Sequence, residues 1–292
     1  MEEIYIISKV TKEIIIDILK CNTNNFINNL NFDEDIVSLI EHIPNELETS
    51  YELCLKGNIV SSMILLRSTF ENILFLMNIV FYPDIIDEYK KVKNNIKPIK
   101  LKSEIIENWD KYFTTIMESK EQTEVEIKNI YDLLSKFVHP NCIRSTTSMI
   151  EKDKNKSEII KYLYMQNITS VLLLYVDFIS KYLNTEANLI YSIFLYEIIC
   201  LLVFIQINID KIKELEQYND YMYLHINEKD IQGYTNIISK EINQISEINN
   251  NEWKKIINNL KEELNKSKYK QKIKELDKIT LELIGLYNKT NN

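Results

Sequence analysis

IVSSMILLRSTFENILFLMNIVF, residues 59–81, contains neither glycine nor proline, and its apolar residues recur every three or four positions. This spacing gathers them on one side of an α-helix that would be about 35 Å long. Gly57-Asn58 precedes the segment and Tyr82-Pro83-Asp84 follows it, and both are helix-stop signals. Residues 59–81 therefore predict a long core helix, entered from an antiparallel helix that ends near Gly57.

Glycine and proline are scarce along the whole chain, with three and four residues among 292. Strands and hairpins need such turn residues roughly every 8–12 positions. An apolar share of 45% and a charged share of 27% are typical of a folded protein with a sizeable core. The sequence predicts an all-α fold, a multi-helix bundle with an additional C-terminal helical module.

The helical patterns divide the chain into three parts. Residues 1–57 predict N-terminal helices, broken at Asn22–Asn25 and Asn31–Asp33 and restarted or kinked at Pro44. Residues 58–209 predict the bundle core. Residues 210–292 are rich in Lys, Glu and Asn and predict amphipathic helices. Their apolar stripes either pack on the bundle or offer a coiled-coil-like surface to another chain.

The segment from Leu189 to Ile209 is the most apolar part of the chain after residue 150, with 14 Leu, Ile, Val or Phe residues. Glu197 lies near its middle, and a charge there opposes membrane insertion. A buried core helix and a membrane span give the same pattern, and both interpretations stay open. We expect the core helix, so a membrane is an unlikely partner.

Charge and cysteine content exclude several classes of protein. A formal net charge of −8 opposes binding of nucleic acid over the whole surface, so any such contact must be local. The four cysteines show no paired spacing, and no phosphate-binding glycine loop is present. We therefore expect no metal and no cofactor. The N-terminus has no signal-peptide pattern, which indicates a cytoplasmic location.

Arginine occurs only at Arg67 and Arg144, although lysine and arginine together number 35. A guanidinium offers a planar fork that a lysine cannot replace, so these two positions are candidates for a functional cation. Arg67 lies in the apolar run 59–81, with Glu71 four residues later. Two interpretations remain: an intrahelical ion pair that stabilises a core helix, or an arginine with a functional role.

A run of six lysines with no intervening acid forms the strongest basic patch in the sequence. Its members are Lys90, Lys91, Lys93, Lys97, Lys100 and Lys102. A solvated loop is one explanation, and a nucleic-acid-binding track along a phosphate backbone is the other.

A further helix, predicted over Thr123–Val138, ends at His139-Pro140. Asp132, Ser135 and His139 are spaced three and four residues apart, so they share one helix face. A helix C-terminus favours the protonated imidazole, and such a histidine can exchange protons near neutral pH. The alternative is a histidine that caps the last carbonyls of the helix.

Leu66-Arg67-Ser-Thr-Phe-Glu71-Asn, followed by Tyr131-Asp132-Leu-Leu-Ser135-Lys-Phe-Val-His139-Pro, resembles the HEPN superfamily of small helical bundles. The resemblance covers roughly residues 45–183. It implies a metal-independent ribonuclease, usually a dimer, in toxin–antitoxin or antiviral phage-defence systems.

The resemblance also implies roles for individual residues. His139 matches the catalytic histidine, which acts on the RNA 2′-hydroxyl or on the leaving group, and Arg67 or Arg144 would stabilise the transition-state charge. Glu71, Ser135 and Asp132 complete the catalytic set. The nuclease signature places arginine shortly before histidine, whereas Arg144 follows His139 here. The competing hypothesis is a non-catalytic scaffold or sensor that binds a protein or nucleotide partner through its helical surfaces.

Overall fold

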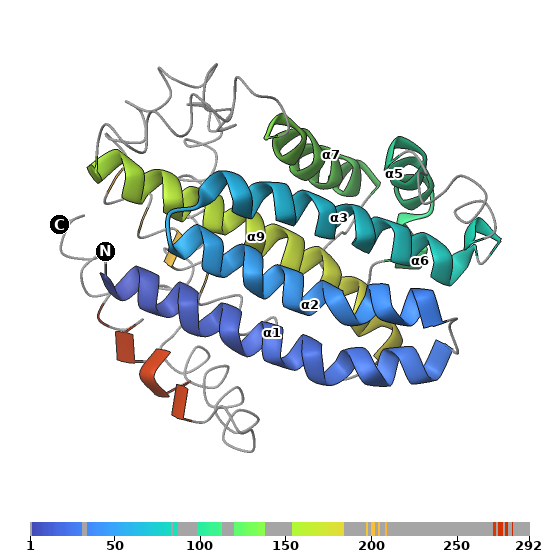
Figure 1. Cartoon of the computed structure of the whole chain (residues 1–292), viewed down its shortest axis with the longest axis horizontal. Helices are drawn as coiled ribbons and strands as arrows, with labels where there is room; N and C mark the ends of the chain where they lie inside the picture. Colours follow the sequence, from blue (N-terminus) through green and yellow to red (C-terminus); the bar gives the residue numbers. More distant parts are fainter. Residues whose placement is uncertain are drawn as a thin grey trace, which may run out of the picture. The chain divides into compact units, whose positions relative to one another are not determined.

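The structure is a computed structural model, and it describes the chain in separate ranges (Figure 1). The described residues are 2–30, 34–82, 84–86, 98–112, 120–137 and 154–183, together with 197, 200, 201, 204, 208, 271, 272, 274–276, 278, 279 and 282. Across these positions the chain is helical apart from short turns, and no strand occurs among them. The prediction of an all-α, multi-helix protein is confirmed.

Seven helices have defined bounds. They are α1 (Glu2–Leu30), α2 (Glu34–Leu55), α3 (Ile59–Phe81), α5 (Pro98–Glu107), α6 (Trp109–Tyr112), α7 (Lys120–Lys136) and α9 (Lys154–Leu183). Contacts between Cα atoms divide the chain into two compact units. Unit 1 comprises Met1–Ile15 and Asn188–Asn292, and unit 2 comprises Ile16–Ala187. The division at residues 57 and 209 that the sequence suggested stays a prediction.

Helices α2 and α3 form an antiparallel hairpin in unit 2, joined at Gly57. The Gly57 amide donates to the Cys54 carbonyl at 3.0 Å, and the Asn58 amide donates to the Leu53 carbonyl at 2.9 Å. This pair of bonds is the Schellman motif, which needs a left-handed residue, and Gly57 supplies it with φ 83°. The predicted helix stop at Gly57-Asn58 is confirmed.

Two buried serines fasten the hairpin further along. Ser50 Oγ donates to the Ser62 carbonyl at 2.9 Å, and Ser62 Oγ donates to the Ser50 carbonyl at 2.6 Å. Both residues are fully buried. Small side chains at these positions let the two helix backbones approach closely while every hydroxyl keeps a partner.

Helix α3 is the centre of unit 2. It packs against α2 and α9, and α5 and α7 lie along it as well (Figure 1). Its core stripe is fully buried and includes Met63, Leu66, Phe70 and Ile73. The bounds Ile59–Phe81 are those the sequence predicted, because the apolar stripe and both stop signals agree.

Two predicted breaks differ from the structure, and a third, Asn31–Asp33, lies outside the described residues. Helix α1 continues through Asn22–Asn25, where the hydroxyl of Thr23 donates to the Leu19 carbonyl at 2.6 Å. Helix α2 continues through Pro44, because its apolar face is buried on both sides of the proline, at Ile40 and Ile43 before it and at Leu47 after it. Along α2, burial of a continuous apolar face outweighs the local cost of the proline.

The lysine run is also only partly a loop. Lys100 and Lys102 belong to helix α5, which begins at Pro98, a favourable first residue for a helix. Lys90, Lys91, Lys93 and Lys97 lie outside the described residues.

By length and composition, Ile59–Phe81 and Ser157–Ile179 could each cross a membrane. Buried core helices of soluble proteins meet the same criterion, and 72% of the second window is buried within the protein. Most of the segment 189–209 lies outside the described residues, so the choice between core helix and span there stays a prediction.

Candidate functional site

The candidate site begins with Arg67 on α3. Arg67 Nε donates to Glu71 Oε1 at 3.1 Å, one helical turn away, so the expected ion pair is present. The side chains are 21% and 32% exposed, which places the pair at the edge of the core and in reach of solvent. The bond with Glu71 uses Nε, and the outer guanidinium nitrogens form no hydrogen bond with any other residue that the structure describes.

Tyr131 on α7 brings two cations together. The Arg67 Cζ atom lies 5.6 Å from the centroid of the Tyr131 ring, and the Lys102 Nζ atom lies 3.8 Å from the same centroid. Both separations are within the range of a cation–π interaction. Residues far apart in the sequence, from α3, α5 and α7, therefore meet around one phenol ring.

The charged form of Lys102 is disfavoured at this position. Desolvation by burial lowers the pKa of Lys102 below its usual value of 10.5, and the positive charge of Lys128 lowers it further. The carboxylate of Asp132 opposes this shift by favouring the charged ammonium. Asp132 acts through space only, because no ion pair joins it to Lys102 within the described part of the chain.

Asn78 fixes the helix that carries Lys102. Its side-chain Nδ2 donates to the Leu74 carbonyl within α3 at 2.8 Å and to the Leu101 carbonyl on α5 at 3.2 Å. Asn78 is fully buried. Because Leu101 directly precedes Lys102, this bond holds the backbone that carries Lys102 next to α3.

The remaining predicted residues are placed unequally. Asp132 and Ser135 both lie on α7, and the Oγ atom of Ser135 is buried with no hydrogen-bond partner among the residues described. His139 and Arg144 lie outside the described residues, and so does the side chain of Lys100. Their proximity to Arg67 stays a prediction. No group of three or more His, Cys, Asp or Glu side chains in the described ranges is placed to hold a metal ion.

Sequence reasoning missed Tyr131 and Asn78. Tyr131 stands in the motif that carries the resemblance, but nothing in its spacing indicates that it faces Arg67. Asn78 shares the helical stripe of Arg67 and Glu71, and a polar residue so deep in an apolar run was the available signal.

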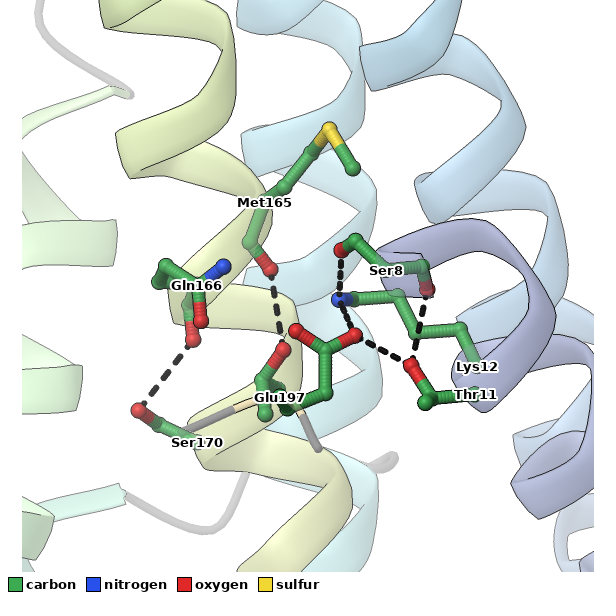
Figure 2. A network of polar contacts seen from close by, with 8 residues as sticks. Ser8, Thr11, Lys12, Met165, Gln166, Ser170 and Glu197 are labelled. Carbon is green, nitrogen blue, oxygen red and sulfur yellow. Dashed lines mark hydrogen bonds and ion pairs between the residues drawn. The ribbon is translucent and has the colours of Figure 1, made fainter. Parts of the chain in front are cut away.

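A second polar cluster lies in unit 1. Lys12 Nζ donates to Glu197 Oε1 at 2.7 Å and to Ser8 Oγ at 2.8 Å, and Thr11 Oγ1 also donates to Glu197 Oε1 (Figure 2). The exposed fractions of the Lys12 and Glu197 side chains are 0% and 1%. This ion pair explains how a charge is accommodated in the most apolar segment of the C-terminal part. Lys12 gave no signal in the sequence beyond a lysine in an apolar helix.

Cys200 lies close enough to this ion pair to feel its charges. Burial raises the pKa of the Cys200 thiol well above its usual value, the negative charge of Glu197 raises it further, and Lys12 partly opposes the shift. The thiol is therefore held in its protonated, unreactive form.

Comparison with known proteins leaves the Arg67–Tyr131–Lys102 geometry as the basis for assigning a function. No family model matches the chain, and no curated protein and no solved structure matches it.

Proposed function

We propose that this chain is a HEPN-like, metal-independent endoribonuclease that acts in a cytoplasmic phage-defence or toxin–antitoxin system. One observation supports the proposal above others. The guanidinium of Arg67 on α3 lies beside Tyr131 on α7, and Tyr131 opens the motif that ends at His139 eight residues later. The two motifs that carry the resemblance thus come from helices in direct contact.

The proposed reaction is an internal transesterification of RNA. The 2′-hydroxyl oxygen attacks the adjacent phosphorus and gives its proton to a base, while the bond from phosphorus to the 5′-oxygen breaks and that oxygen takes up a proton. The products are a 2′,3′-cyclic phosphate and a free 5′-hydroxyl. His139 serves as the base or the acid, and Arg67 stabilises the additional negative charge on the phosphoryl oxygens. Arg144 is the alternative cation for that role.

The proposal is tested with purified protein, a defined RNA and EDTA. The wild type is expected to cleave and to leave 2′,3′-cyclic phosphate ends, whereas His139→Ala is expected to lose the activity by at least about a hundredfold. His42→Ala is the matched control, because His42 is exposed on α2 and belongs to neither motif. Loss of cleavage on adding EDTA would exclude the metal-independent mechanism.

A non-catalytic scaffold or sensor is the second candidate function. The observation that favours it is the bond from Arg67 Nε to Glu71, which gives the arginine a structural partner without any ligand. In that case His139 stabilises the end of its helix, and the partner is a protein, a nucleotide or a second copy of the chain. Equal RNA cleavage by the wild type and His139→Ala would favour this function over the ribonuclease.

A further inference from the structure

Lys102 has no conventional partner. Its ammonium group carries three N–H donors, yet it forms no hydrogen bond and no ion pair with any residue in the described ranges. Among the described residues, its recorded interaction is with the face of the Tyr131 ring, whose centroid lies 3.8 Å from Nζ. The Lys102 ammonium has lost part of its hydration, and the aromatic face compensates for only part of that loss. Binding of an anion therefore stabilises the ammonium.

Arg67 offers a second set of free donors beside it. Only Nε is used, by Glu71, and the two outer nitrogens have no acceptor from the described part of the chain. Because Lys102 and Arg67 contact the same ring, the distance from Lys102 Nζ to Arg67 Cζ cannot exceed the sum of their distances to the ring centroid. Oxygens of one tetrahedral anion, or of two neighbouring phosphates, can span such a gap where both cations lie on the same side of the ring.

The surroundings restrict the chemical class of the ligand. The ammonium occupies a face of Tyr131, so that face is not open for stacking by a nucleobase. The carboxylates of Glu71 and Asp132 are near and oppose the approach of any anion, so a ligand whose several strong acceptor oxygens can bind both cations is favoured over one with few. A phosphate group fits these conditions.

We infer that Lys102, Arg67 and Tyr131 form a binding site for a phosphate group. The site holds a ligand through its phosphate and does not contact its base. If the phosphate is an internal diester of RNA, the inference rests on the proposed function and names the subsite that holds the strand. A terminal phosphate of a nucleotide offers the same chemistry.

Two probes separate these sources. The first is a 2′-O-methyl RNA oligonucleotide without terminal phosphates, which presents only internal diesters and cannot be cleaved by attack of the 2′-oxygen. The second is AMP, which presents only a terminal phosphate. Binding of each is measured by calorimetry on the full chain, for the wild type, Lys102→Gln, Lys102→Arg and Lys128→Gln.

Lys128→Gln is the matched control, since Lys128 is exposed on α7 and acts on Lys102 only through its charge. We expect Lys102→Gln to weaken binding of at least one probe about tenfold, Lys102→Arg to retain most of the affinity, and Lys128→Gln to change it less than about twofold. For the RNA probe, the slope of log affinity against log salt should fall by about one in Lys102→Gln.

Two results would overturn the inference. One is that neither probe binds the wild type at millimolar concentration, and the other is that Lys102→Gln and Lys128→Gln weaken binding equally. Thermal unfolding of each variant verifies that the chain is folded. If Lys102→Gln is not folded, Lys102→Arg, which keeps the positive charge, is compared with the wild type instead.

Failure of the ribonuclease proposal is recognised separately. His139→Ala is expected to bind the 2′-O-methyl probe as the wild type does. If binding depends on Lys102 but no RNA is cleaved, the phosphate site stands and the ribonuclease does not. If RNA is cleaved but Lys102→Gln binds both probes normally, the ribonuclease stands and the phosphate site does not.

Discussion

The bond from Arg67 to Glu71 is compatible with a structural role and with a functional role for the arginine. The coupling free energy of the pair distinguishes the two roles. For a half-exposed pair one turn apart on a helix, the coupling free energy is about 0.3–0.5 kcal/mol. We expect a double-mutant cycle of Arg67→Met and Glu71→Gln, measured by urea unfolding, to give a coupling of that size. A coupling above about 2 kcal/mol would make the pair a structural device and would weaken its assignment to RNA cleavage.

Lys102 makes stability depend on pH in the alkaline range. Because burial lowers the pKa of the folded lysine, the unfolded chain holds this proton more tightly between the lowered pKa and 10.5. The desolvation cost is fully present below that interval, and the free energy of unfolding rises as the pH increases through it.

Urea unfolding of the wild type and Lys102→Met at several pH values up to about 10.5 measures this effect. Relative to Lys102→Met, the wild type should gain stability as the pH rises. Parallel pH profiles for the two proteins would contradict a desolvated Lys102. Lys128→Met serves as the control, because its ammonium is exposed.

At the scale of the residue, the sequence reveals one half of the candidate site. Arg67 stands out as a charge in an apolar run, and Glu71 is its natural neighbour. Tyr131 and Lys102 could not be assigned to the same place, because their meeting depends on how α3, α5 and α7 pack. Helical periodicity says which face of one helix is apolar, and it does not say which helices share a contact.

The hairpin of α2 and α3 depends on the backbone conformation of one residue, Gly57. A Cβ atom at this position would meet no atom within 4 Å, so steric overlap with neighbours plays no part. The positive φ of 83° remains unfavourable for any L-residue. We expect Gly57→Ala to lower the free energy of unfolding by about 1 kcal/mol, measured in urea. No change would mean that the loop adopts another conformation.

The ion pair of Lys12 and Glu197 in unit 1 is costly to disturb, because both side chains are buried. Lys12→Met leaves Glu197 buried without its cation, with a second oxygen, Oε2, that already lacks a hydrogen-bond partner among the described residues. We expect a loss of about 3–5 kcal/mol in the free energy of unfolding.

Adding Glu197→Leu to Lys12→Met should recover most of that loss, since it removes the buried charge as well. Lys9→Met is the control: Lys9 is exposed and 3.8 Å from Glu13, and its loss should cost less than about 0.5 kcal/mol. If Lys12→Met is as mild as Lys9→Met, the pair is not buried in solution.

At the scale of the element, the sequence predicts α3 to the residue, because stripe and stop signals coincide there. It fails at Asn22–Asn25, where α1 continues through residues of low helix propensity, and at Pro44, where burial of the continuing apolar face of α2 prevails. It also assigns Lys102 to a loop, because a run of lysines hides the helix that Pro98 begins.

The whole molecule consists of two units, and α1 contributes residues 2–15 to one and residues 16–30 to the other. We expect Lys12→Met to increase amide hydrogen exchange in residues 2–15 and around Glu197, while the amides of α3 keep their protection. Mass spectrometry of peptic fragments measures both in one experiment. Equal loss of protection in α3 would mean that the two units unfold as one.

The bond from Lys12 to Glu197 joins positions 185 residues apart, and this has a consequence for biosynthesis. At about 5–20 residues per second, a ribosome needs roughly 10–40 s to add the glutamate after the lysine. During that interval the ammonium must stay hydrated, so the nascent N-terminal segment cannot bury this face until the later part of the polypeptide emerges. During translation the apolar side chains of the N-terminal segment are exposed to chaperones. The segment completes its folding only after most of the chain has been translated.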